Sequence, residues 1–392
     1  MKKMLFVINN MEIGGIQKSL VNLLEAIKEE YDISLVIFAP EGKLMELLPK
    51  DIKIVPVNPL LQVLGISQKQ AYGRGIKIVL LQTFGAVWSR IFGNQRIINW
   101  LVKKEKISEY YDYAISYSQF PPLKYFIGGT NEFVLDSVNA KTKIAFIHSD
   151  FQNCGGNSKY AREKYKLFDK IALCSKSAQH SFLQIMPMLK EKTYVVKNFN
   201  SYEKIKKFAF DNTVKYKKNI FNVISISRLS IEKGIDRGIK AVAHCLKQGI
   251  KVNYHIIGSG PDKKRLMDIV NEYEIKENIF FYGETDNPYR FLPNADLLLF
   301  PSIHEAAGLV IEEAASLGVP VLASETIASK EMVLDNDFGW VSKNNQKEFN
   351  FNLEFLLRNK SVIDNKKETM QNKIFNNELN IEELKNFIDE DI

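Results

Sequence analysis

The sequence predicts an α/β protein built from two doubly wound parallel-sheet domains, and three observations lead to this fold class. Short apolar runs alternate with helical patterns along most of the chain. Most of these runs are continuously apolar, which is typical of parallel strands that are buried on both faces. The alternation occurs in two series, separated by the polar, lysine-rich residues 198–219. Because strand–helix–strand units wind right-handed onto an open sheet, each series predicts one Rossmann-like domain.

The individual elements follow from these runs. The first series predicts strands at residues 4–9, 32–39, 53–57, 112–118, 143–148, 170–175 and 193–198, and the second at 222–228, 252–258, 279–283, 295–302 and 320–324. Helices are expected between them, for example over 17–27, where Leu20, Leu23, Leu24 and Ile27 recur at helical spacing. A later helix is expected to begin near Gly308 and to end at Gly318.

These elements predict three parts of the chain: a first domain at 1–200, a second at 201–370 and a helical tail at 371–392. The last 32 residues are acidic and rich in asparagine. We expect the tail to pack back on the first domain and to fray at its end. Ligands of open parallel sheets bind at the carboxyl ends of the strands. The two domains are therefore expected to face each other across a cleft and to share a site there.

Composition limits the class of protein. A chain of 392 residues can form two separate cores, and 45% hydrophobic with 25% charged residues is ordinary for a globular protein. Three distant cysteines, Cys154, Cys174 and Cys245, argue against a disulfide framework and predict a reducing, cytoplasmic location. Only five apolar residues precede Asn9, too few for a signal peptide, and no run of 18 apolar residues predicts a membrane span.

The net charge of +7 is concentrated in residues 61–110, which hold eight Lys or Arg against Glu105 and Glu109. The same segment carries Trp88 and Phe92 within an apolar, helix-like run. This combination suggests contact with an anionic membrane surface, at the inner face of the membrane. The alternative is a solvated helix pair with an ordinary core face. Nucleic-acid binding is not expected, because no recognition motif accompanies the charge.

Two glycine turns could bring the backbone close to a ligand. Gly14 and Gly15 follow the first strand and open the next helix, whose free N–H groups suit a phosphate. Gly258 and Gly260 follow the strand at 252–258 in the same way. Neither is the G-x-G-x-x-G of dinucleotide folds, and a plain tight turn remains the alternative for both.

Charged residues lie at the expected carboxyl ends of two strands in the second domain. Arg228 and Lys233 could clamp a diphosphate, although basic residues in loops are often only solvated. Glu305 precedes the helix start at Gly308, and Glu313 lies inside that helix. The helix start would favour an anion, and Glu313 could accept two hydrogen bonds from a ribose diol. The alternative is that Glu305 caps the helix and Glu313 is solvated.

At these residues the chain resembles the retaining GT-B glycosyltransferases of family 4 (glycosyl transferases group 1), of the bacterial capsule or exopolysaccharide type. The resemblance rests on "SRLSIEKG" at 227–234 and "PSIHEAAGLVIEEAASLGVPVLAS" at 301–324, where Glu305 and Glu313 match a pair of glutamates separated by seven residues. "GGI" at 14–16, "IGSGP" at 257–261, "IFFYG" at 279–283 and "FIHSD" at 146–150 extend it over roughly residues 1–340.

The resemblance implies roles for named residues. Arg228 and Lys233 would bind the donor diphosphate, Glu313 the ribose, and Glu305 the transferred sugar. Further donor contacts would come from backbone groups of Gly15, Gly258, Gly283, Ala307, Gly308 and Leu309. The base would lie near 283–285, and His148 would point toward the sugar, although a histidine at a strand end is more often an ordinary one. As catalytic residues the resemblance implies Glu305, His148, Arg228 and Lys233, with no metal and no cofactor beyond the nucleotide-sugar co-substrate.

The resemblance also implies the reaction: a hexosyl unit moves from a nucleoside-diphosphate sugar, with UDP the expected nucleotide, to a saccharide hydroxyl with retention. The first domain would bind the acceptor, expected to be lipid-linked. Ala306 and Ala307 replace the frequent E-G-F-G pattern, so the donor sugar stays open; Ser227 and Phe146 are milder departures. The rival readings are a non-catalytic partner subunit and a sugar-nucleotide epimerase or hydrolase. The oligomeric state stays open.

Overall fold

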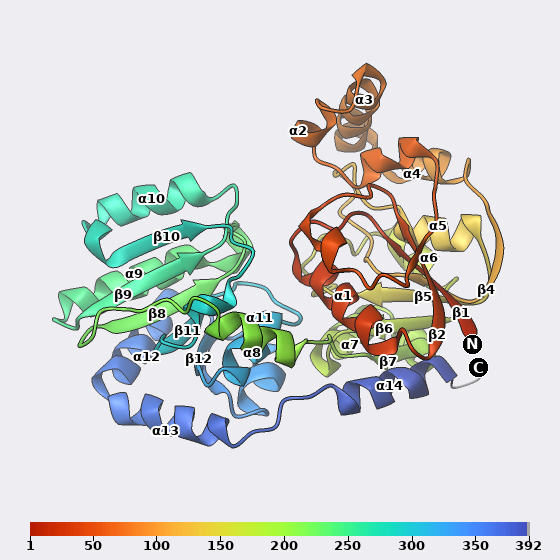
Figure 1. Cartoon of the computed structure of the whole chain (residues 1–392). Helices are drawn as coiled ribbons and strands as arrows, with labels where there is room; N and C mark the ends of the chain where they lie inside the picture. The colour runs from red at the N-terminus through yellow and green to blue at the C-terminus, as the bar shows by residue number, and fades with distance from the viewer. Residues whose placement is uncertain (390–392) are drawn as a thin grey trace. The chain divides into compact units, whose positions relative to one another are not determined.

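The computed structural model describes residues 1–389 and divides into two compact units. The first unit contains Met1–Phe199 together with the chain from Asn377 onward, and the second contains Asn200–Asn376. Each unit is a parallel sheet with helices packed around it (Figure 1). The α/β class and the two parallel sheets predicted from the sequence are confirmed.

The first unit is built on a seven-stranded sheet of order β3-β2-β1-β4-β5-β6-β7, in which every pair is parallel. The order reverses between β1 and β4, where the two halves of the sheet meet. Its elements are β1 (Lys2–Ile8), α1 (Gly15–Ile27), β2 (Tyr31–Ile37), β3 (Lys53–Ile54), α2 (Gln68–Ala71), α3 (Ile76–Phe92), α4 (Gln95–Val102), β4 (Ile107–Ser116), α5 (Thr130–Ser137), β5 (Val138–Ile147), α6 (Lys159–Tyr165), β6 (Lys170–Leu173), α7 (Lys176–Ile185), β7 (Thr193–Val195) and α14 (Glu378–Asp389).

The last helix, α14, belongs to the first unit although almost two hundred residues separate it from β7. Leu384, Phe387 and Ile388 lie in the same core cluster as the strand residues Met4 and Phe6. The buried Lys170 donates from Nζ to the backbone oxygen of Phe387 at 2.6 Å, which satisfies a carbonyl at the end of this helix. The fraying expected at the very end of the chain concerns residues 390–392, which lie outside the described residues.

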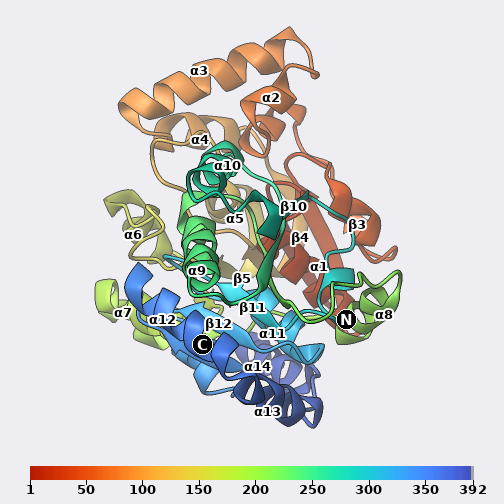
Figure 2. The same cartoon turned by 90° about the vertical axis from the view of Figure 1, so that its left-hand side faces the viewer.

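The second unit is built on a six-stranded parallel sheet of order β10-β9-β8-β11-β12-β13, whose order reverses between β8 and β11. Figure 2 gives a second view of the helices around it. Its elements are α8 (Tyr202–Phe210), β8 (Phe221–Ile226), α9 (Ile235–Lys247), β9 (Val252–Ile257), α10 (Lys263–Glu272), β10 (Ile279–Gly283), β11 (Leu297–Phe300), α11 (Leu309–Ser316), β12 (Val321–Ser324), β13 (Gly339–Ser342), α12 (Gln346–Arg358) and α13 (Lys360–Gln371).

Strand β11 shows why the strands of this unit are continuously apolar. Leu297 and Leu299 lie in one core cluster, which includes residues of α9 and α12. Leu298 and Phe300 lie in a second cluster, which includes residues of α8 and α11. Alternate side chains of a strand point to opposite faces, so a strand covered on both sides buries every residue. Each such side chain contributes about 2 kcal/mol to folding, which fixes the strand ends that carry the site.

The first unit also buries an ionisable group away from its sheet edges. Glu132, in α5, is buried, and its Oε2 has no hydrogen-bond partner. Burial raises the pKa of this carboxyl from its ordinary 4.5 to about 7. Nearby Lys164 and a hydrogen bond from Tyr160 oppose that rise only in part. Between pH 4.5 and about 7, the folded protein therefore holds a proton at Glu132 that the unfolded chain has already released.

Replacing Glu132 by glutamine is expected to stabilise the protein at pH 8 by about 3 kcal/mol. Because the folded state binds more protons in this window, the wild-type free energy of unfolding falls as pH rises from 4.5 to about 7. The glutamine variant lacks this fall. Urea titrations at pH 5 and pH 8 measure it, and an equal pH response in both proteins would disprove the assignment.

Candidate functional site

The loop after β8 carries the predicted cations and is held against the loop after β11. Gly234 has a positive φ of 61°, and a Cβ there would lie 2.1 Å from the backbone oxygen of Pro301. The backbone N–H of Ile303 donates to the backbone oxygen of Glu232 at 2.8 Å. The two loops are therefore packed together where the strand order reverses, the position at which ligands of open α/β sheets bind.

Lys233 and Glu305 meet across this junction. Lys233 Nζ lies 2.6 Å from Glu305 Oε2, and the two side chains are only 24% and 12% exposed. Water screens such a pair less than a pair on the open surface. The structure therefore joins a predicted phosphate-binding cation to the first of the two predicted glutamates and holds both beside the start of α11.

Arg228 is placed differently. Its guanidinium Nη2 lies 2.9 Å from Glu232 Oε1, and the side chain is 69% exposed. Glu232 Oε1 also accepts a hydrogen bond from Ser230 Oγ at 2.7 Å. Sequence reasoning overlooked Glu232, although it stands between the two predicted cations. The described contacts bring Lys233, but not Arg228, to Glu305.

The predicted glycines after β9 and β10 contact each other. The N–H of Gly258 donates to the backbone oxygen of Gly283 at 2.7 Å, and both have positive φ angles, 130° and 76°. A Cβ at Gly258 would lie 1.9 Å from the backbone oxygen of Ser227. The close approach that requires glycine at 258 is therefore to the loop after β8. This close approach and the Gly258–Gly283 hydrogen bond hold together the chain at the ends of β8, β9 and β10.

Helix α11 begins as predicted, with Gly308 at its N-cap and Gly318, at φ 77°, just after its end. No side chain caps the N-terminus, and the N–H of Gly308 donates to Met332 Sδ at 3.0 Å. Sulfur is a weak acceptor, so an anion could replace it with a gain in hydrogen-bond strength. Ala307 and Leu309, on either side of Gly308, are half-buried.

The adjacent glutamates of α11 differ in surroundings. Glu312 Oε2 accepts hydrogen bonds from Asn200 Nδ2 at 2.8 Å and from Tyr202 OH at 3.2 Å, which tie the helix to the beginning of the second unit. Glu313 is buried, with 3% of its surface exposed. A buried carboxylate is retained only where polar groups or a ligand satisfy it. Glu312 therefore has a structural role, and Glu313 is the glutamate that the motif spacing selected.

Within the first unit, Gly15 and His148 both lie on the carboxyl-edge side of that unit's own sheet. Helix α1 begins at Gly15, after a six-residue loop that follows β1, with no side-chain cap at Gly14 and no acidic residue in its first turn. Its N-terminal end therefore presents backbone N–H groups with positive potential. His148 follows β5. Both residues therefore lie toward the edge at which ligands of open parallel sheets bind.

His148 is enclosed by aromatic rings. Phe146 stacks at 5.7 Å between ring centroids, and Tyr117 lies at 4.6 Å. Burial lowers the pKa of the imidazole to about 4, and a hydrogen bond with Asn198 opposes that shift in part. Nε2 is buried without a partner. A neutral imidazole with an unpartnered nitrogen can exchange a hydrogen bond with a ligand hydroxyl.

A short hydrogen-bond network lies behind His148, and sequence reasoning did not identify it. Ser19 Oγ donates to Asn198 Oδ1 at 2.9 Å and lies 3.0 Å from Tyr117 OH. Asn198 is the last residue of the expected strand at 193–198, and this position at a strand end was the available signal. Since Asn198 also bonds to His148, it fixes the orientation of the imidazole.

Replacing Asn198 by aspartate is expected to raise the pKa of His148 from about 4 to about 6, because a carboxylate stabilises the imidazolium. NMR titration of the five histidines, with a His148→Gln variant to assign the signal, measures the change. Asn198→Ala should leave His148 neutral above pH 5. A wild-type pKa near 6.5, or no response to Asn198→Asp, would contradict this environment.

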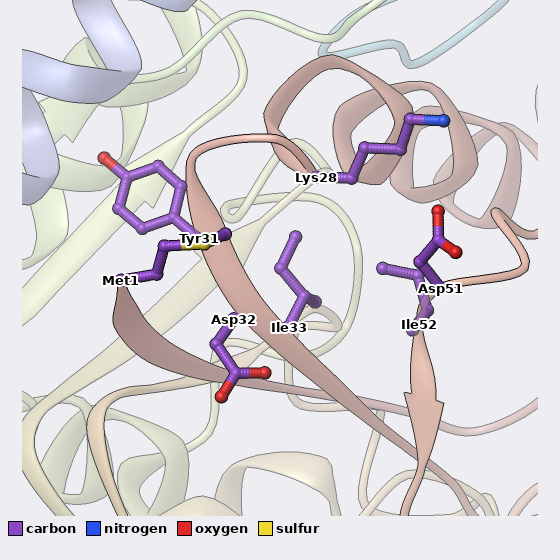
Figure 3. A pocket seen from close by; sticks show the side chains of 7 residues that line it. All are labelled: Met1, Lys28, Tyr31, Asp32, Ile33, Asp51 and Ile52. Atoms are coloured by element: carbon purple, nitrogen blue, oxygen red, sulfur yellow. The ribbon is translucent and has the colours of Figure 1, made fainter.

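The first unit also has a shallow pocket of about 410 Å³ (Figure 3). It is lined by Met1, Lys28, Tyr31, Asp32, Ile33, Asp51 and Ile52. Met1 and Tyr31 stand at the beginnings of β1 and β2, so the pocket lies at the amino edge of the sheet. This is the edge opposite to Gly15 and His148, and we assign the pocket no part in the site. Within residues 1–389, no group of three or more His, Cys, Asp or Glu is placed to hold a metal ion.

Comparison with known proteins finds a family match in the second unit. Residues 205–376, nearly the whole second unit, match the family described as glycosyl transferases group 1. The O-antigen biosynthesis glycosyltransferase WclY of Escherichia coli is 28% identical over 157 residues, which cover 40% of this chain and 43% of that protein. The chain spans 32–43% of the length of this and two other curated relatives.

Two solved structures resemble the whole chain. TarM of S. aureus, in complex with Fondaparinux, alpha-GlcNAc-glycerol and UDP, matches with a TM-score of 0.70 and 15% identity, over 99% of this chain and 100% of that one. HepE of Anabaena, in complex with UDP and glucose, matches with a TM-score of 0.64 and 18% identity, over 95% and 93%. These similarities confirm the predicted GT-B fold.

Proposed function

We propose that this chain is a retaining glycosyltransferase, because residues 205–376 match the family described as glycosyl transferases group 1. It moves a hexosyl unit from a nucleoside-diphosphate sugar to a hydroxyl of a saccharide acceptor. UDP is the proposed nucleotide, supported by the UDP complexes of the similar TarM and HepE structures. Synthesis of a surface polysaccharide is the proposed setting, supported by relatives named for O-antigen and colanic acid synthesis.

The observation that carries the proposal is the Lys233–Glu305 pair beside the start of α11. Transfer breaks the bond between the sugar's anomeric carbon and the diphosphate oxygen, so negative charge develops on the leaving diphosphate. Lys233 and the N-terminal end of α11 supply fixed positive potential for that charge. Glu305 holds Lys233 in place before the donor arrives and then faces the transferred sugar.

The other residues divide the donor among them. Arg228, released from Glu232, adds a second cation for the diphosphate, and Glu313 binds the ribose hydroxyls. Backbone groups of Gly258, Gly283, Ala307, Gly308 and Leu309 line the nucleotide and sugar. Gly15 and His148 are the proposed contributions of the first unit, the first toward phosphate and the second toward a sugar hydroxyl.

The proposed step retains configuration and uses no metal. The acceptor hydroxyl attacks the anomeric carbon on the face that the diphosphate leaves, and its proton passes to a diphosphate oxygen. One carbon–oxygen bond breaks and one forms, and no oxidant or reductant is needed. Excluding water from this step prevents hydrolysis of the donor.

The acceptor is proposed to be a lipid-linked oligosaccharide, bound through the first unit at the inner face of an anionic membrane by residues 61–110. A cytoplasmic location fits three cysteines that form no disulfide within residues 1–389. Nucleic acid has no place in this proposal.

The direct experiment is a donor screen. The full chain is incubated with UDP-, GDP- and dTDP-sugars and extracted lipid-linked acceptors, and the products are weighed by mass spectrometry. A product heavier by one hexosyl unit supports the proposal. Donor hydrolysis without transfer would favour a hydrolase. If the chain neither binds nor turns over any of these donors, the proposed enzyme is refuted.

A further inference from the structure

Helix α3 packs with its faces reversed from the usual order. The residues it buries are Ile78, Gln82, Gly85 and Ser89, of which only Ile78 is a large apolar residue. Gln82 Nε2 donates to the backbone oxygen of Ile66 at 3.0 Å, and a Cβ at Gly85 would lie 2.2 Å from the ring of Phe126. The fully buried side of α3 therefore consists mainly of small and polar side chains, where most helices present an apolar stripe.

The opposite side of α3 carries the large apolar residues. Ile76, Leu80, Phe84, Val87 and Ile91, which we call the outer stripe, are each 51–70% exposed. At the α-helical spacing these five residues fall within about 80° of arc on one side of the helix. A continuous apolar stripe of this size is unusual on a water-exposed surface and marks an interaction site. Figure 1 shows α2 and α3 as an outlying part of the first unit.

Charge indicates which partner covers the outer stripe. Lys77 and Arg90 are exposed and lie on the two flanks of the stripe by helical spacing. Residues 52–104 contain eight Lys or Arg and no Asp or Glu. A second copy of this face would set like charges against each other, whereas an anionic lipid leaflet would neutralise them. Long basic side chains beside an apolar stripe can also reach back to lipid headgroups.

From these observations we infer that α3 lies in the plane of an anionic leaflet, with the outer stripe among the acyl chains and Lys77 and Arg90 at the headgroups. No helix within residues 1–389 is long and apolar enough to cross a bilayer, so contact of this kind is interfacial. The inference deepens the proposed function, since it brings the first unit to the surface that holds a lipid-linked acceptor. The observations on α3 do not depend on the proposed function; only the purpose of the membrane contact rests on it.

The test is flotation of the full chain with phosphatidylcholine vesicles that contain about 30% phosphatidylglycerol at about 0.05 M salt. Wild-type protein is expected to float, and binding should fall at least tenfold at about 0.5 M salt or on vesicles without phosphatidylglycerol. The triple variant Leu80→Gln, Phe84→Gln, Ile91→Gln should bind about 30-fold more weakly. The double variant Lys77→Gln, Arg90→Gln should weaken binding to anionic vesicles but not to vesicles without phosphatidylglycerol.

The matched control is Phe351→Gln with Phe355→Gln, two exposed apolar residues on α12 of the second unit. This variant should float like wild type. The inference would be overturned if the triple variant floated as well as wild type. It would also be overturned if wild type bound neutral vesicles as well as anionic ones. Sedimentation velocity without lipid tests the alternative that a second copy of the chain covers α3. Self-association that the triple variant abolishes would support that alternative and overturn the inference. The assay contains no nucleotide sugar, so its failure would leave the donor chemistry untouched.

Discussion

Replacing Lys233 by alanine is expected to lower kcat/KM for the sugar nucleotide by about 1,000-fold, the largest effect of any single change proposed for this chain. Lys233 is the one predicted cation that the structure fixes against a predicted glutamate, at 2.6 Å from Glu305. A fixed cation beside the leaving diphosphate acts most strongly in the transition state, so most of the loss should fall on kcat. Steady-state kinetics over a range of donor concentrations separates kcat from KM.

Lys240→Ala is the matched control for this variant. Lys240 lies in α9 of the same unit and pairs with Asp236 at 3.4 Å, so its loss also removes one lysine from an ion pair. Activity should stay within about twofold of wild type, as for most pairs near the surface. A Lys233→Ala enzyme within tenfold of wild type would contradict the proposed role of this cation.

Replacing Glu313 by glutamine is expected to weaken UDP binding by about 100-fold, the second largest effect. A buried carboxylate that accepts two hydrogen bonds from ribose hydroxyls loses about 3 kcal/mol when it becomes a neutral amide. The 3% exposure of Glu313 keeps water from replacing those bonds. Isothermal titration calorimetry with UDP measures the dissociation constant, and kcat at saturating donor should fall much less than affinity.

The neighbouring residue provides the comparison. Glu312→Gln changes the same chemical group one position earlier, where the carboxylate accepts from Asn200 and Tyr202 instead. It should lower the melting temperature and leave the affinity for UDP within about threefold. Should both variants lose UDP affinity alike, the assignment of the ribose to Glu313 would fail.

Sequence periodicity predicted most strands of the two sheets but missed one edge strand. All twelve expected strands are present, because continuous apolar runs such as Leu297–Phe300 are required wherever a strand is covered on both faces. Strand β13 was missed. It is four residues long, begins with Gly339 and lies at an edge of its sheet, so burial imposes only a weak apolar pattern on it.

The candidate site was predictable as a set of residues but not as a set of contacts. Motif spacing selected Lys233 and Glu305, yet nothing in the sequence says that they pair, because 72 residues separate them. The same limit hid the Ser19–Asn198 hydrogen bond behind His148, which spans 179 residues. Such contacts depend on which strand ends become neighbours, and the order of strands in a sheet is not written in local periodicity.

Helix α3 shows a further limit. Its sequence is apolar with basic residues, and that pattern alone allowed either a membrane-facing helix or an ordinary core-facing one. Which face turns inward was decided by Gly85, which admits the ring of Phe126, and by Gln82, which finds a backbone acceptor. Both depend on tertiary neighbours.

Calorimetric titration of UDP into the full chain and into two double variants tests whether the proposed residues bind the donor nucleotide. One UDP site per chain is expected, lost in the Lys233→Ala, Glu313→Gln protein and kept in the Lys240→Ala, Glu312→Gln protein. Binding that survives the first pair of substitutions, or a wild-type chain that binds none of UDP, GDP and dTDP, would refute the proposed donor site.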